Sequence, residues 1–112
     1  SSDHKVKAAK AEANIARYQL ADAKEKVELQ VSQASYKVNE TAKRLSMAEK
    51  NLEKADENLR YAKLGFMEGV IPTSNVLEAQ TAWLSAQSDK IDAQIDVKLT
   101  EVYLRKSMGV LK

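Results

Sequence analysis

The most regular feature of the chain is a seven-residue repeat of apolar positions between residues 31 and 66. One column of the repeat holds large side chains, and the other is nearly all alanine. A repeat sustained over this length predicts a coiled coil. Because small side chains let a neighbouring helix approach closely, we expect tight antiparallel packing. The large column is Val31, Val38, Leu45, Leu52, Leu59 and Phe66, and the small column is Ala34, Thr41, Ala48, Ala55 and Ala62.

Upstream of Val31 the apolar repeat changes phase, which rotates the buried face around the helix axis. A second apolar stripe lies on another side of this region, so the first third of the helix is expected to need two neighbouring helices. The first stripe is Val6, Ala9, Ala13, Ala16, Leu20, Ala23 and Val27, and the second is Ala8, Ala11, Ile15 and Tyr18.

The only proline and two of the three glycines fall between residues 65 and 72. Gly69 is expected at the C′ position of the first helix, where glycine adopts a left-handed conformation without penalty. Pro72 cannot continue that helix, and Ser74 or Asn75 is expected to cap the next one. The sequence therefore predicts an all-α fold, a long antiparallel helical hairpin with helices at about 5–67 and 74–108 and a turn at 68–73. Gly109 is expected to close the second helix.

The second helix carries two apolar stripes on adjacent faces, more than one partner helix requires. One stripe is Val76, Ala79, Trp83, Ala86, Ala93, Val97 and Leu104, and the other is Leu77, Leu84, Ile91, Ile95 and Val102. Trp83 is interpreted as a seam residue.

The two helices differ in length, at roughly 95 Å and roughly 50 Å for a rise of about 1.5 Å per residue. Folding back at the turn sets residue n opposite roughly residue 141 − n by the same helix geometry. Residues 1–30 then have no partner within the chain although they carry two apolar faces. We expect the isolated chain to self-associate, as an antiparallel dimer in which two such segments cover each other.

Composition and charge exclude several functional classes. Eighteen Lys and Arg against 16 Asp and Glu, interspersed along the chain, are typical of solvated helix faces and predict no nucleic-acid binding. Cysteine is absent, and His4 is the only histidine. No catalytic set, phosphate loop or metal-ligand cluster is recognisable. We predict a protein that is not an enzyme and has no cofactor.

The stretch from 57 to 80 closely resembles the periplasmic turn of the TolC-type outer-membrane efflux channels. In their repeats an aromatic residue, Gly and an apolar residue precede Ser or Thr, Asp or Asn, and an apolar-x-x-Ala-Gln run. Residues 103–109 resemble the Leu-x-x-x-x-Gly that ends such a repeat. The matching positions at the turn are Phe66, Gly69, Val70, Ser74, Asn75 and residues 76–80.

The resemblance implies a segment of an α-helical barrel that hangs from the outer membrane of a Gram-negative cell into the periplasm. Such channels are homotrimers that meet a periplasmic adaptor and, through it, an inner-membrane pump. This chain would be a fragment of one repeat, and its turn would be the tip that contacts the adaptor. The alternative is a turn chosen for geometry alone. The implied contact residues are Gly69, Val70, Ile71, Pro72, Ser74 and Asn75. Val70 and Ile71 are expected to form an exposed apolar pair at the turn, so Val70→Asp and Ile71→Asp should block efflux without unfolding the hairpin.

Asp89, Asp92 and Asp96 fall on one face of the second helix, at spacings of three and four residues. One interpretation is a solvated face paired with lysines of neighbouring helices. The other is that these carboxylates line the tunnel, where threefold repetition would form acidic rings that favour cations.

Two alternatives come from other classes of protein. The hairpin of a periplasmic adaptor would match Arg60 and Leu64, but Ile71 stands where such tips carry serine. Adaptor hairpins also have helices of similar length. A plain structural coiled coil, such as a spectrin-like spacer, would explain the heptads but neither the turn sequence nor the doubled stripes.

Overall fold

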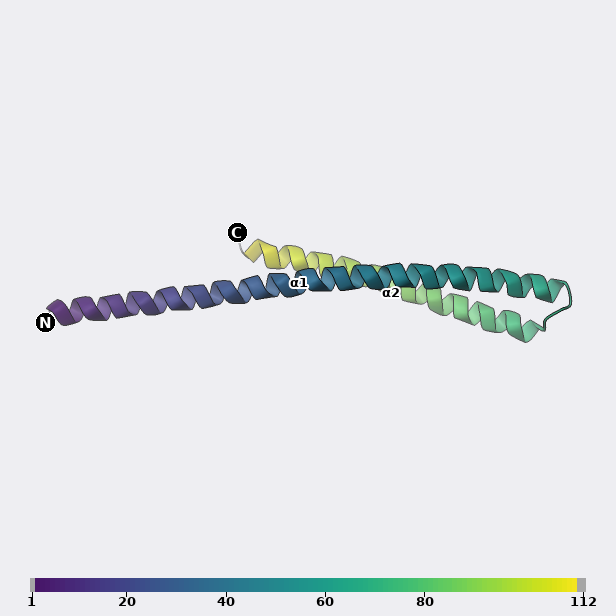
Figure 1. Cartoon of the computed structure of the whole chain (residues 1–112), viewed down its shortest axis with the longest axis horizontal. Coiled ribbons are helices and arrows are strands. Elements are labelled where there is room, and N and C mark those ends of the chain that lie inside the picture. The colour runs from purple at the N-terminus through teal and green to yellow at the C-terminus, as the bar shows by residue number, and fades with distance from the viewer. Residues whose placement is uncertain (1, 111–112) are drawn as a thin grey trace.

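The computed structural model describes residues 2–110, which form two antiparallel helices joined by a short turn (Figure 1). Helix α1 spans Ser2–Met67 and helix α2 spans Thr73–Val110. The molecule measures 101 × 20 × 13 Å. The predicted all-α hairpin with one long and one shorter helix is confirmed. Within the described residues, neither helix contains a segment apolar enough to cross a bilayer.

The core is a linear seam in which small residues of α1 face small residues of α2. Thr41 and Thr100, whose hydroxyl oxygens lie 2.9 Å apart, set its register, which is the one expected from the position of the turn. The heptad repeat carries this register along both helices, and every one of these facing positions is buried or half-buried. The facing pairs are Ala34 with Ser107, Thr41 with Thr100, Ala48 with Ala93, Ala55 with Ala86, and Ala62 with Ala79.

Large side chains flank the small ones and are half-buried. They belong to the large column of α1 from Val31 to Leu59 and to its counterpart on α2, which includes Trp83. The Trp83 indole N–H donates to the Asp56 carboxylate across the seam. Phe66, placed in this column by the repeat, is 47% exposed because α1 ends one residue later and the turn leads the chain away.

Helix α2 ends beside the middle of α1, and the N-terminal part of α1 projects beyond it without a partner (Figure 1). Every described residue from 2 to 26 is exposed, and Val27 is the first half-buried one. Helix α2 runs through Gly109 to Val110, so Gly109 does not close it. Gly109 does not adopt a positive φ; among the described residues, Gly69 is the only glycine that does.

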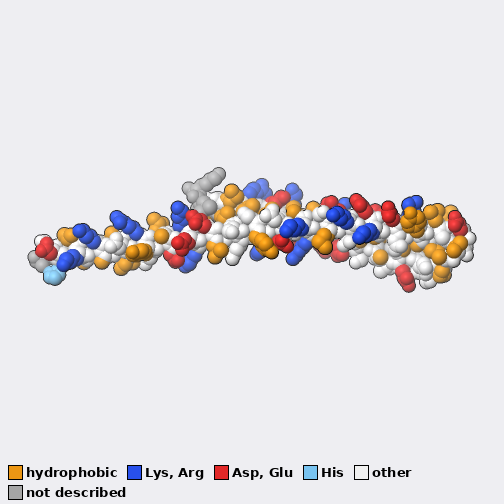
Figure 2. All heavy atoms as spheres, viewed as in Figure 1, with side chains coloured by type: hydrophobic (Ala, Val, Ile, Leu, Met, Phe, Trp, Pro, Cys, Tyr) orange, Lys and Arg blue, Asp and Glu red, His pale blue; other side chains and the backbone are white. Residues whose placement is uncertain are grey.

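Charged side chains contribute little to the association of the two helices. Lys, Arg, Asp and Glu side chains are interspersed along the face shown in Figure 2. The ion pairs among the described residues all join positions three or four apart on one helix: Asp22 with Lys26, Glu40 with Lys43, and Lys98 with Glu101. Exposed pairs of this kind stabilise a helix by only about 0.3–0.5 kcal/mol each. The hairpin is therefore held together mainly by its apolar seam.

Candidate functional site at the hairpin tip

The turn begins with a Schellman motif at the end of α1. Gly69 has a φ of 75°, the left-handed conformation predicted for it. Its N–H donates to the Phe66 carbonyl at 3.0 Å, and the Val70 N–H donates to the Gly65 carbonyl at 2.8 Å. These two bonds satisfy carbonyls that the helix end leaves without partners. The backbone that presents Val70 is thereby fixed by hydrogen bonds.

Ile71 occupies the space that Gly65 leaves open by having no side chain. A Cβ atom at position 65 would lie 2.9 Å from the Ile71 Cγ1 atom, which shows how closely Ile71 packs there. The Ile71 N–H also donates to the Gly65 carbonyl, at 3.2 Å. The expectation of an exposed Val70–Ile71 pair was therefore wrong for Ile71, which is half-buried.

Val70 is left facing solvent and is 74% exposed. In many Schellman motifs the residue at this position packs back against a side chain in the last turn of the helix. Here the position three residues before the cap is Gly65, which offers no side chain, and Ile71 covers it. Val70 is thus an apolar side chain held outward at the end of a rigid turn.

Helix α2 begins at Thr73, one residue earlier than expected, so Ser74 and Asn75 lie in its first turn and do not cap it. The Pro72 carbonyl accepts from the Asn75 N–H at 3.1 Å. Proline suits this place because its fixed φ leads into the helix and its missing N–H costs no helical hydrogen bond. The polar side chains of Ser74 and Asn75 are consequently exposed beside the turn.

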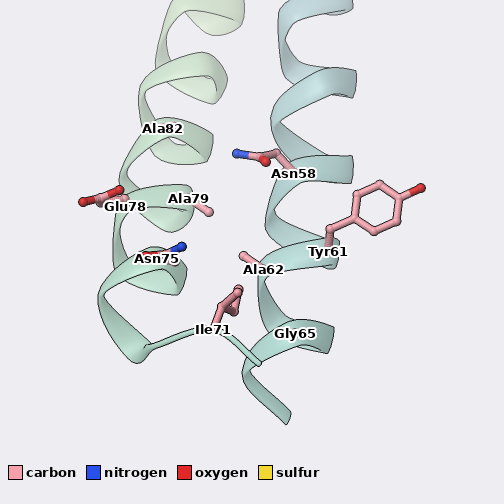
Figure 3. Close-up of a pocket in the computed structure, with 9 residues that line it drawn as sticks. All are labelled: Asn58, Tyr61, Ala62, Gly65, Ile71, Asn75, Glu78, Ala79 and Ala82. Carbon is pink, nitrogen blue, oxygen red and sulfur yellow. The ribbon is translucent and has the colours of Figure 1, made fainter. Parts of the chain in front are cut away.

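An open groove of about 530 Å³ lies along one side of the hairpin just behind the turn (Figure 3). Its floor is formed by the facing pair Ala62 and Ala79, and Ile71 closes the end nearest the turn. Asn58 and Asn75 project into the gap between the helices from opposite sides. The groove therefore combines an apolar floor with amide groups, a surface suited to another polypeptide.

The three aspartates line a second, shallow groove in the middle of the hairpin. Asp89, Asp92 and Asp96 are all exposed and share this groove with Arg44 and Asn51 of α1. None of the three forms an ion pair within the part of the chain that the structure describes. The structure thus brings the predicted acidic side chains to one face.

Helix α2 has apolar surface on two nearly opposite sides, so the expectation that its two stripes lie on adjacent faces was wrong. One side is the seam, and the other is the second predicted stripe, whose members are 40–62% exposed. At 3.6 residues per turn the stripe lies roughly 150° around the helix from the seam. The three aspartates lie between seam and stripe on one flank, and a row of glutamines lies on the other. The stripe is Leu77, Leu84, Ile91, Ile95 and Val102, and the glutamines are Gln80, Gln87 and Gln94.

Comparison with known families gives a match that spans nearly the whole chain. The family model described as outer membrane efflux protein matches residues 2–110. The chain belongs to the outer membrane efflux protein family. The same chain has no significant match among curated proteins or among solved structures.

Membership in the outer membrane efflux protein family confirms the resemblance drawn from the turn sequence. It makes the chain part of an outer-membrane efflux channel and favours this class over the adaptor hairpin and the plain coiled coil. The family is one of transport proteins and not of enzymes. Within the described residues no group of acidic or histidine side chains is arranged to hold a metal ion.

Proposed function

We propose that this hairpin forms part of the periplasmic tunnel wall of the efflux channel, and that its turn is the tip that docks on a periplasmic adaptor. The observation that carries the docking role is Val70, an exposed apolar side chain presented by a hydrogen-bonded turn. Exposing it costs solvation free energy that a binding partner would recover. The groove behind the turn adds an apolar floor and amide groups to the same surface.

The wall role is supported by the two apolar sides of α2. A helix in a closed wall has a neighbour on each side, one face toward the lumen and one toward the exterior. Helix α2 fits this arrangement, because the seam contacts α1, the exposed stripe is free for a further helix, and the flanks between them carry the three aspartates on one side and the three glutamines on the other. In the assembled channel, which we propose to be a homotrimer, the stripe would pack against a helix of the same wall.

Replacing Val70 by aspartate in the intact channel protein tests the docking role. Val70 makes no seam contact, so Val70→Asp is expected to abolish efflux while the hairpin keeps its helix content by circular dichroism. Cells carrying this channel as their only efflux route should become as drug-sensitive as cells without it, and the pump coupled to the adaptor should lose function with it. Normal resistance at equal channel abundance would refute the docking role.

Two further variants serve as controls. Val70→Thr keeps the shape of the side chain without adding charge and is expected to retain most of the efflux activity. Ile71→Asp, by contrast, places a carboxylate against Gly65 inside the turn and is expected to disturb the hairpin itself. Contrary to the expectation from the sequence, Ile71→Asp therefore cannot separate a loss of docking from a loss of the fold, and Val70 alone provides a clean test.

The shared face of Asp89, Asp92 and Asp96 supports a second proposal, that these carboxylates line the tunnel. Three copies of each would form negatively charged rings, which attract cations. Replacing all three by asparagine is expected to reduce the cation selectivity of the channel in single-channel recordings. A matched replacement of Gln80, Gln87 and Gln94 by serine changes the opposite flank. Unchanged selectivity in the asparagine variant would remove the proposal.

A further inference from the structure

The large heptad column of α1 changes its chemistry near the point where α2 ends. Opposite α2, this column is apolar and half-buried from Val31 to Leu59. Followed toward the N-terminus at the same seven-residue spacing, it continues as Lys24, Arg17 and Lys10 and ends at Asp3, all exposed. The side of α1 that receives α2 is therefore basic beyond the end of α2.

The heptad position one residue before the large column changes in the opposite way, from polar side chains opposite α2 to alanine beyond it. Beyond α2 it is occupied by Ala9, Ala16 and Ala23, whereas opposite α2 it is occupied by Lys37 and Arg44. The apolar face has therefore moved around α1 by about 60°, the angle between positions three residues apart on a helix that turns about 100° per residue. A helix covering residues 2–26 would not lie in line with α2, and the basic column would run along its flank.

The basic column has almost no acidic partners on its own helix. Neither Lys10 nor Arg17 has an aspartate or glutamate three or four residues away, the spacings at which side chains on a helix meet. Lys24 has Glu28 four residues on, but the two are not joined by an ion pair in the structure. Among the described residues from 2 to 26, the one ion pair joins Asp22 and Lys26 at 3.2 Å, on another side of the helix. These positive charges are thus free to meet acidic groups outside the chain.

We propose that residues 2–26 bind a helix that presents acidic side chains to the column Lys10, Arg17 and Lys24 and small apolar side chains to Ala9, Ala16 and Ala23. Charges beside a coiled-coil seam select the partner in this way. The inference does not depend on the proposed tunnel wall, although in such a wall the acidic helix would be a neighbouring helix.

A second copy of the same segment fits this surface poorly. In an antiparallel pair of helices, the equivalent flanks of the two seams face each other. Two copies packed about Ala16 would then set Lys10 against Lys24 and Arg17 against Arg17. Like charges at these positions destabilise the pair. The charge pattern therefore argues against the antiparallel dimer expected from the apolar stripes.

Binding of two synthetic helical peptides to the complete chain tests the proposal. Both peptides carry alanine and leucine in adjacent heptad columns, and they differ only in having glutamate or lysine at the flanking position. In fluorescence anisotropy at low salt, the glutamate peptide is expected to bind on the order of tenfold more tightly than the lysine peptide. The difference should largely vanish at 1 M salt, where charges about 3 Å apart are already screened.

Charge reversal gives the matched control. The variant Lys10→Glu, Arg17→Glu, Lys24→Glu should reverse the preference and bind the lysine peptide more tightly. Reversing three exposed lysines elsewhere on α1, Lys43, Lys50 and Lys54, should leave the preference for glutamate unchanged. Circular dichroism of both variants confirms that they remain helical.

Three outcomes would overturn the proposal. The first is equal binding of the two peptides, or a preference that both variants change alike. The second is a salt-resistant dimer of the chain that blocks peptide binding. The third is binding to vesicles containing phosphatidylglycerol that is lost in the Lys10, Arg17 and Lys24 variant while peptide binding is absent, which would identify an anionic membrane surface as the partner.

Discussion

Replacing Ala48 by leucine tests whether the seam depends on small side chains. Ala48 is 8% exposed and faces Ala93, which is 9% exposed, so the two helices leave little room between them for a larger side chain, although both alanines border the groove that holds the three aspartates. A leucine must push the helices apart or adopt a strained rotamer, which costs about 1–3 kcal/mol in a packed core. At about 1.4 kcal/mol per factor of ten, the folded hairpin should become roughly 5–150 times less populated relative to the unfolded chain.

Trp83 provides the assay because it is the only tryptophan and lies half-buried at the seam. Its fluorescence during urea unfolding reports separation of the two helices and is insensitive to fraying of the projecting part of α1. Two further variants grade the effect. Ala55→Leu, at a half-buried seam position, should cost less than Ala48→Leu, and Ala21→Leu, on the exposed projection, should stay within about 0.5 kcal/mol of the parent.

The order of these three variants is the decisive result. If Ala48→Leu is as stable as Ala21→Leu, the helices are not packed through their small column and the assigned seam is wrong. If all three variants lose stability equally, the effect arises from the helix and not from the seam. Either result would refute the packing described above.

Three smaller predictions can be checked with the same unfolding assay. Thr41→Val should cost about 0.5–1.5 kcal/mol by removing the hydroxyl contact with Thr100, while the double valine variant should recover much of the loss, because no hydroxyl is then left without its cross-seam partner; additive losses would contradict this. Gly69→Ala should cost about 1–2 kcal/mol because of the positive φ, although no residue other than its two chain neighbours lies within 4 Å of the added methyl group. Gly65→Ala should yield none of the stabilisation of about 1 kcal/mol usual within helices, because Ile71 must move; a full gain would show that Ile71 yields freely.

Much of the hairpin could be predicted from the sequence because its core depends on one repeating contact. The alanine column and its counterpart on α2 determine which faces meet, and the single turn determines the register that Thr41 and Thr100 confirm. Gly69 was predictable for a similar reason, since the local sequence leaves few alternatives for ending α1. Heptad spacing and turn chemistry both act over short distances along the chain.

The details of the tip could not be predicted in the same way. Whether Val70 or Ile71 faces solvent depends on the space beside Gly65, which exists only once the turn has formed. The sequence shows two adjacent apolar residues and nothing that separates them. Lys90 likewise could not be assigned to the seam from the pattern of apolar residues. It is a charged residue, yet it occupies the large column of α2 and is half-buried. A long lysine stem can cover apolar surface while its charge reaches water.

The side chains of α1 that face α2 change from apolar to basic near the point where α2 ends. If α2 were extended in line beyond Val110, its large column would meet Lys24, Arg17 and Lys10 and would have to desolvate them. Taking an ion out of water costs several kcal/mol unless an opposite charge replaces the solvent. The apolar face instead continues about 60° around the helix, over Ala9, Ala16 and Ala23. Helix α1 is therefore built to receive two different helices in succession, an apolar one beside the tip and an acidic one beyond it.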